Sequence, residues 1–111
     1  MSKEINFDDF TKVDLRVGTI IEANDFPEAR KPSYKLVIDF GDLGKRQSSA
    51  QITTLYSREE LIDKQVVAVV NFSPKQIANF MSECLILGAV QGDNVVLLKP
   101  ENSIKNGTAV S

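Results

Sequence analysis

The chain has 111 residues, of which 42% are hydrophobic and 25% are charged, and its net charge is −2 at pH 7. This length suits one domain, residues 1–111, and the composition is that of a globular protein rather than a disordered or fibrous one. Histidine is absent, which removes the usual acid–base residue near neutral pH and the commonest metal ligand. We therefore expect a non-enzymatic binding domain that uses no metal or cofactor.

Three features predict an unexported, cytoplasmic protein without membrane insertion. No apolar run approaches the ~18 residues that are needed to span a bilayer. The first residues, Met1 to Ile5, contain no signal-peptide apolar region. The single cysteine, Cys84, cannot form an internal disulfide and lies in an apolar run, so we expect a buried thiol in a reducing compartment. The slightly acidic balance also argues against bulk-charge coating of nucleic acid, so any polyanion site must be local.

Apolar and polar residues alternate along most of the chain, which is typical of half-buried strands. Gly18, in the middle of the first predicted strand, indicates a bulge or bend that lets one strand serve both sides of a small barrel. The fourth strand is apolar on both faces and should be central. The tail, residues 100–111, has room for one more turn and a short strand. In chain order, the predicted strands are residues 13–23, 34–40, 47–53, 65–72, 83–90 and 94–98.

Two capping-box spacings predict helices. Ser57 and Glu60 would begin one helical turn, while Ser73 and Gln76 would begin a short amphipathic helix over residues 73–81. Such a helix could plug a barrel as part of the core, or it could line an apolar pocket for peptide side chains. Its apolar residues recur with spacings of three and four, namely Ile77, Phe80 and Met81.

Five or six short strands with a capping helix and terminal extensions describe a small all-β barrel. The OB-fold, a five-stranded Greek-key barrel, fits best, because a helix caps one end of it and its strand face binds oligonucleotides or peptides. Periodicity alone leaves an SH3-like barrel open as an alternative. We predict a barrel core over about residues 13–98 with extensions at residues 1–12 and 99–111.

Several segments carry a family resemblance. Residues 13–18, residues 34–36 with 38–41, and residues 59–61 with 64–66 resemble the tRNA-binding domain that is appended to some methionyl- and phenylalanyl-tRNA synthetases. Within that family, residues 48–53 (SSAQIT) and residues 70–83 (VNFSPKQIANFMSE) resemble the CsaA group of export-related chaperones.

The resemblance implies an OB-fold whose extensions build a two-fold homodimer, and it implies two activities. The first is the binding of unfolded or export-bound polypeptides, in contact with the export machinery, and the alternative is the recognition of tRNA shape. The chain departs from the general tRNA-binding pattern at residues 78–79 (AN), where that pattern has a basic residue and a glycine, and at residues 84–85 (CL), where it has Gly-Met. At least one phosphate contact is therefore missing, and tRNA binding should be weaker than in a dedicated binder.

Two overlapping sets of candidate site residues follow, and each could also be ordinary core or solvated surface. The peptide-binding set combines apolar contacts with hydrogen-bonding side chains: Phe72, Lys75, Gln76, Ile77, Asn79, Phe80 and Met81. The RNA-binding set supplies cations and polar groups for phosphates and base edges: Arg30, Lys31, Lys35, Asn71, Lys75, Ser82 and Glu83. For Arg16 we favour a structural role beside an acid such as Asp14.

Overall fold

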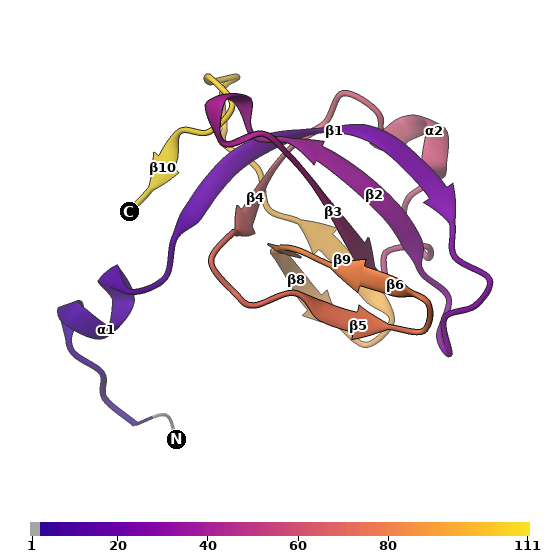
Figure 1. Ribbon diagram of the computed structural model, residues 1–111, viewed down its shortest axis with the longest axis horizontal. Coiled ribbons are helices and arrows are strands. Elements are labelled where there is room, and N and C mark those ends of the chain that lie inside the picture. The colour runs from indigo at the N-terminus through magenta and orange to yellow at the C-terminus, as the bar shows by residue number, and fades with distance from the viewer. Residues whose placement is uncertain (1–2) are drawn as a thin grey trace.

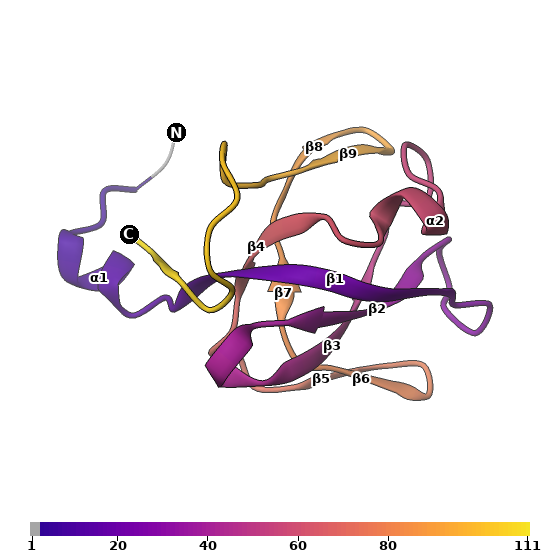
Figure 2. The ribbon, with the colours of Figure 1, turned by 90° about the horizontal axis from the view of Figure 1, so that it is seen from above.

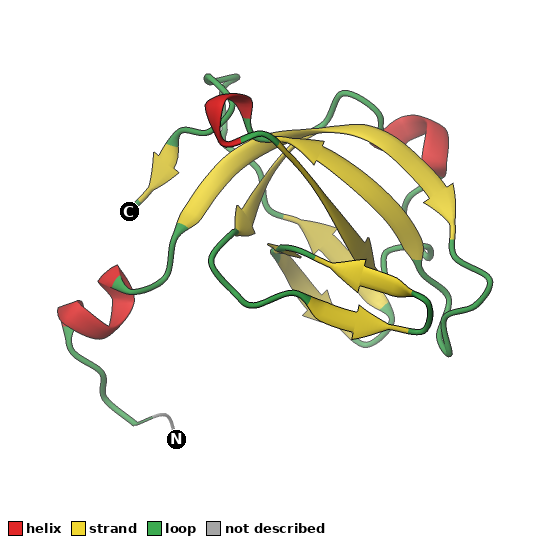
Figure 3. Ribbon diagram, viewed as in Figure 1, coloured by secondary structure: helices red, strands yellow, loops and turns green. Residues whose placement is uncertain are grey.

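The computed structural model describes residues 3–111, and strands dominate it (Figure 3). The strands are β1 (Leu15–Asp25), β2 (Tyr34–Asp39), β3 (Lys45–Ala50), β4 (Gln65–Val69), β5 (Lys75–Ile77), β6 (Phe80–Ser82), β7 (Leu85–Ile86), β8 (Gly88–Gln91), β9 (Asn94–Leu97) and β10 (Ala109–Val110). The helical elements are α1 (Phe7–Thr11), the 3-10 turn η1 (Gly41–Leu43) and α2 (Arg58–Leu61).

Five strands form the barrel. The long β1 lies at the centre of a sheet with the order β3-β2-β1-β4-β7, in which every neighbouring pair is antiparallel. The sheet coils so strongly that β3 comes back into contact with β6 and β7 (Figure 1). Two hairpins, β5–β6 and β8–β9, lie on opposite sides of this barrel (Figure 2). The predicted all-β barrel of the OB type is confirmed, and so is the central position of the fourth strand.

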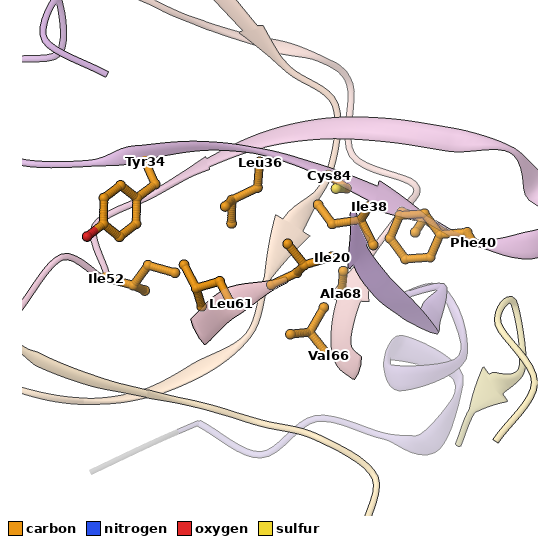
Figure 4. Packing of buried hydrophobic residues seen from close by; sticks show 11 residues of the cluster. Ile20, Tyr34, Leu36, Ile38, Phe40, Ile52, Leu61, Val66, Ala68 and Cys84 are labelled. Carbon is orange, nitrogen blue, oxygen red and sulfur yellow. The ribbon is translucent and has the colours of Figure 1, made fainter. Parts of the chain in front are cut away.

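The core fills the barrel mainly with side chains of β1, β2 and β4 and of the segments next to them (Figure 4). Ala50 of β3 and Ile86 of β7 are partly buried against this core. Alternation along β2 sends its apolar residues inward, so Leu36 and Ile38 are fully buried. Cys84 is buried among them, as the sequence predicted. Burial of this apolar surface is the main stabilising term of the fold.

Gly18 is required by packing. A Cβ atom at this position would lie 2.5 Å from Cγ2 of Ile38 and 2.7 Å from the ring of Phe40. The register shift in β1 occurs further along, between Ile20 and Glu22, where β1 pairs with β2. β1 therefore contains the predicted bulge, but the bulge is not at Gly18. Gly18 is needed because Ile38 and Phe40 pack too closely for a side chain.

Helix α2 forms as predicted, because the Ser57 hydroxyl accepts the N–H of Glu60 and the Glu60 carboxylate accepts the N–H of Ser57. The helix expected over residues 73–81 is wrong. This segment is the β5–β6 hairpin, in which Ile77 pairs with Phe80 across a two-residue loop. The first loop residue, Ala78, has a φ of 53°, as in the turns that favour hairpins.

Several predicted strand limits also change. The strand expected over residues 83–90 is divided into β7 and β8, because the chain leaves the barrel sheet at Leu87. The N–H of Leu87 donates to the carbonyl of Val67, and its own carbonyl accepts the N–H of Leu98. The third strand ends at Ala50, before the predicted limit at residue 53, so the residues that follow it are free of the ladder. The predicted turn and short strand in the tail are present as residues 106–107 and β10.

Both terminal segments lie at the same end of the barrel, where α1 stands clear of the sheet and β10 lies near it (Figures 1 and 2). Residues 1 and 2 of the predicted N-terminal extension fall outside the described residues. Strand β10 pairs with the start of β1, with Leu15 opposite Val110. Within residues 3–111, no helix is long and apolar enough to cross a membrane.

Candidate functional site

A groove of about 1340 Å³ opens on the side of the barrel where β3 and β7 diverge. Its walls come from four parts of the chain: the loop between β1 and β2, the end of β3, the β5–β6 hairpin with the segment before it, and β7 with β9. The lining residues include Arg30, Lys31, Ser49, Gln51, Ile52, Phe72, Lys75, Gln76, Ile77, Ser82, Glu83, Leu85, Ile86, Val95 and Leu97.

The floor of the groove is apolar. Ile52 is buried, and Ile86, Val95 and Leu97 are half-buried against the barrel core. Phe72 is 57% exposed and Leu85 is 48% exposed, so apolar surface is available to a ligand in the groove. An open surface of this kind binds apolar side chains without demanding a particular sequence.

The rim of the groove is basic. Arg30 and Lys31 approach from the loop between β1 and β2, and Lys75 approaches from β5. The only acidic side chain among the lining residues is Glu83, whose carboxylate already accepts the backbone N–H of Gln47 at 3.0 Å. Since three cations face one engaged carboxylate, the groove attracts negatively charged groups although the whole chain carries a net charge of −2.

The β5–β6 hairpin is anchored by an aromatic contact. The rings of Phe80 and Phe26 lie 5.4 Å apart and are tilted by 59°. Phe26 is buried where the loop between β1 and β2 begins, and the ammonium group of Lys35 lies 5.5 Å from the centre of its ring. This cluster joins the hairpin to the loop and so fixes two walls of the groove.

The two predicted residue sets converge on the same groove, although only in part. Of the peptide-binding set, four residues line it, namely Phe72, Lys75, Gln76 and Ile77. Asn79 lies at the hairpin loop, Phe80 packs on Phe26, and Met81 lies on the hairpin face opposite to that of Phe80, so these three residues are not part of the lining. Of the RNA-binding set, the lining residues are Arg30, Lys31, Lys75, Ser82 and Glu83.

Two residues of the RNA-binding set lie outside the lining. Lys35 contacts Phe26, as described above. Asn71 has its side chain engaged with the N-terminal segment: the amide oxygen accepts the N–H of Asp14 at 2.9 Å, and the amide nitrogen donates to the carbonyl of Lys12 at 2.7 Å. These bonds fasten the chain that enters β1.

Arg16 has the structural role that we favoured. Its Nε donates to the Asp14 carboxylate at 2.6 Å, and its guanidinium also donates to the carbonyl of Gly107 at 3.0 Å. The contact ties the first strand to the C-terminal segment.

The sequence reasoning missed the β3 and β7 walls of the groove. Ser49, Gln51, Ile52, Leu85 and Ile86 all line it, yet none belonged to either set. A signal was present, because the third predicted strand is unusually polar for a strand of a small barrel. That polarity is explained by an edge that faces the groove and not the core.

Cys84 is a buried residue of the core cluster and also lines the groove. Burial raises the pKa of its thiol from 9.0 to about 11, although a hydrogen bond with Ser48 acts in the opposite direction. The group therefore stays protonated at neutral pH. Among residues 3–111, no three side chains of the metal-ligating types gather into a cluster.

An OB-type barrel whose side opens into a basic, apolar-floored groove defines a binding domain. Residues 15–109 match the family described as "Putative tRNA binding domain". The chain belongs to this tRNA-binding domain family.

Similar proteins include methionine–tRNA ligases. The chain is 42% identical over 106 residues to a methionine–tRNA ligase of Pyrococcus abyssi, and 40% identical over 107 residues to that of Thermotoga maritima. Each alignment covers 96% of this chain but only 14% and 17% of the ligases, so the chain spans a small part of their length.

Two solved chaperone structures are also similar to the chain. The chaperone CsaA of Bacillus anthracis is 54% identical, with a TM-score of 0.95 over 98% of this chain and 100% of that one. The CsaA chaperone protein of Picrophilus torridus is also 54% identical, with a TM-score of 0.91 over 97% of this chain and 100% of that one.

Proposed function

We propose that the chain is a molecular chaperone that binds unfolded or export-bound polypeptides in the groove and acts as a homodimer in the cytoplasm. The observation that carries this proposal is the open apolar floor beside the exposed Phe72. Folded proteins bury their apolar side chains, so a groove of this kind selects chains that have not yet folded. The 54% identity to two proteins described as chaperones, over nearly all of both chains, supports the same function.

The basic rim adds a second element to this function. Arg30, Lys31 and Lys75 would attract acidic residues of the client polypeptide and speed its encounter with the groove. The apolar floor would then supply most of the affinity. We therefore expect the rim to set the association rate and the floor to set the dissociation rate.

The dimer is proposed from the surface of the N-terminal segment. Helix α1 has five residues and buries none of them, and an isolated helix of that length is not stable in water. Phe7 is 73% exposed and Ile5 is 71% exposed, while Phe7 and Phe10 contact one another with ring centres 6.3 Å apart. A second copy of the chain that covers this face would remove the apolar surface from water and hold the helix in place.

Sedimentation velocity at micromolar concentration tests the dimer. Phe7→Asp should convert the dimer to a monomer, because it places a charge in the proposed interface. Leu55→Asp is the matched control, since Leu55 is also exposed but belongs to the segment that joins β3 to α2, and α2 lies at the other end of the barrel from α1. A wild-type chain that sediments as a monomer contradicts the dimer.

The alternative function is tRNA binding, and one specific observation favours it. The three cations of the rim lie on the groove of a chain whose family is described as a tRNA binding domain. Guanidinium and ammonium groups in this arrangement could contact three phosphates of a folded RNA. The apolar floor would contribute little to phosphate binding, which is why we prefer the polypeptide.

Salt dependence separates the two functions. Fluorescence anisotropy would be measured with labelled bulk tRNA and with a permanently unfolded, carboxymethylated protein, each at roughly 50 and 200 mM salt. Three phosphate contacts predict that tRNA affinity falls roughly 20- to 40-fold over this range, whereas apolar capture should change only slightly. Binding of tRNA alone, with this steep salt response, would overturn the chaperone proposal.

A further inference from the structure

Alternate residues of β3 bond to β2, and the backbone N–H and C=O groups of the residues between them point into the groove. The N–H of Phe40 donates to the carbonyl of Gly44, which fixes the phase of the β2–β3 ladder. In an antiparallel ladder the bonded pairs recur every second residue, so residues 46, 48 and 50 bond to β2. The backbone groups of residues 47, 49 and 51 therefore point to the other side of β3.

Gln47 confirms this phase and also shows where the outer edge of β3 stops being paired. Its carbonyl accepts the N–H of Glu83 at 2.8 Å, and its N–H donates to the Glu83 carboxylate. Beyond Glu83 the chain turns away from β3 and continues as β7, which pairs with β4. Within residues 3–111, the outward N–H groups of Ser49 and Gln51 have no hydrogen-bond partner.

The surroundings of this open edge indicate what could pair with it. On one side lies the apolar floor, where the buried Ile52 and the half-buried Ile86 line the groove. The three basic side chains of the rim lie along the same groove, and the single carboxylate there is already engaged. Alternate side chains of an extended strand point to opposite faces, so such a strand can present apolar residues to the floor and acidic residues to the rim.

We propose that the groove receives its client as an added β-strand, which pairs with the outer edge of β3 at Ser49 and Gln51. This inference rests on the proposed chaperone function and names the ligand class, namely extended segments in which apolar and acidic residues alternate. Main-chain hydrogen bonds supply affinity that does not depend on sequence, and the floor and rim supply the preference for alternation. The added strand fills the gap between β3 and β7.

N-methylated peptides test the inference directly. The probe is a fluorescein-labelled heptapeptide of sequence Asp-Val-Asp-Leu-Asp-Val-Asp, and its binding to the wild-type chain is measured by anisotropy. Two derivatives carry N-methyl groups either on the apolar residues or on the three acidic residues between and after them. Only one of these two sets of N–H groups can face β3, because a slip by one residue would turn the acidic side chains onto the apolar floor.

We expect one derivative to bind at least about tenfold more weakly than the parent peptide and the other to bind within about threefold of it. Equal binding by both derivatives and the parent would overturn strand addition while leaving the proposed function intact. Equal loss by both derivatives would also overturn it. A parent peptide that fails to bind would overturn the proposed function together with the inference.

A variant of the chain supplies an independent test. Gln51→Pro removes the N–H that we assign to the client, and Ala50 before it already has the extended backbone that a following proline favours. Gln51→Ala is the matched control, because it removes the side chain and keeps the N–H. Gln51→Pro should bind the parent peptide at least about fivefold more weakly than Gln51→Ala does, and both variants should keep the circular dichroism spectrum of the wild type. Equal affinities of the two variants would contradict the inference.

Discussion

Glu83 and Gln47 close the barrel by exchanging two hydrogen bonds, one between their backbones at 2.8 Å and one from the Gln47 N–H to the Glu83 carboxylate at 3.0 Å. The side chain of Gln47 adds a third bond in the same place, to the carbonyl of Met81 at 2.8 Å. These contacts hold the β5–β6 hairpin against β3. They also mark the point at which pairing ends and the groove begins.

Removal of the Glu83 carboxylate should loosen this closure. Glu83→Ala leaves the half-buried N–H of Gln47 without its acceptor, so we expect the free energy of unfolding to fall by about 1–3 kcal/mol. Glu83→Gln keeps an acceptor oxygen and should lose clearly less. Urea denaturation of the three proteins measures both changes, and equal stabilities would show that the carboxylate does not contribute to closure.

Truncation of Phe80 should detach the hairpin from the loop between β1 and β2. Phe80→Ala removes the ring that packs on Phe26, and we expect a loss of about 1–3 kcal/mol in stability together with weaker polypeptide binding. Met81→Ala is the control, because Met81 is 43% exposed on the other face of the hairpin and should change stability by less than about 0.5 kcal/mol. Thermal unfolding measures both variants. Equal losses of stability would contradict the role of Phe80 in holding the hairpin against Phe26.

The loop of the same hairpin carries a residue with an unfavourable backbone. Ala78 has a φ of 53°, which costs a non-glycine residue about 1 kcal/mol. Ala78→Gly should therefore raise the free energy of unfolding by about 0.5 kcal/mol, since the relief of strain exceeds the added freedom of the unfolded chain. Ala78→Val should lower it, because a β-branched side chain tolerates positive φ still less. Chemical denaturation that ranks the variants in the opposite order would refute this reasoning.

The buried thiol makes stability depend on pH in the alkaline range. The pKa of Cys84 is raised from 9.0 to about 11 in the folded chain, so the unfolded chain releases this proton first. The contribution is therefore fully present below pH 9 and is lost as the pH rises from about 9 to 11, by up to about 3 kcal/mol. The difference between wild type and Cys84→Ala, measured by denaturation at each pH, isolates the thiol. A difference that stays constant over this range would contradict the burial that we describe.

The barrel could be predicted from the sequence because its signals are local and mutually consistent. The alternation along residues 34–39 specifies which face of β2 points to the core, and the doubly apolar β4 specifies a position with neighbours on both sides. The capping box at Ser57 predicted α2 for the same reason, since both of its bonds lie within the helical turn.

The hairpin could not be predicted, because its local signals favour the wrong structure. Ser73 and Gln76 have the spacing of a capping box, and the apolar residues after them recur as they would on one face of a helix. Tertiary contacts override these preferences: Phe80 packs on Phe26, which lies far away in the sequence. The β3 and β7 walls of the groove could not be predicted either. They depend on where β3 and β7 diverge, which is set by tertiary structure and not by local sequence signals.

Capture of unfolded polypeptide by the open apolar floor of the groove can be tested at Phe72. Phe72→Ala removes an exposed side chain from the groove, whereas Val90→Ala removes a comparably exposed apolar side chain that does not line it. We would measure the affinity of each variant for the carboxymethylated unfolded protein by fluorescence anisotropy. We expect Phe72→Ala to weaken binding about fivefold or more and Val90→Ala to leave it unchanged. Equal affinities for both variants and the wild type would contradict the proposed site.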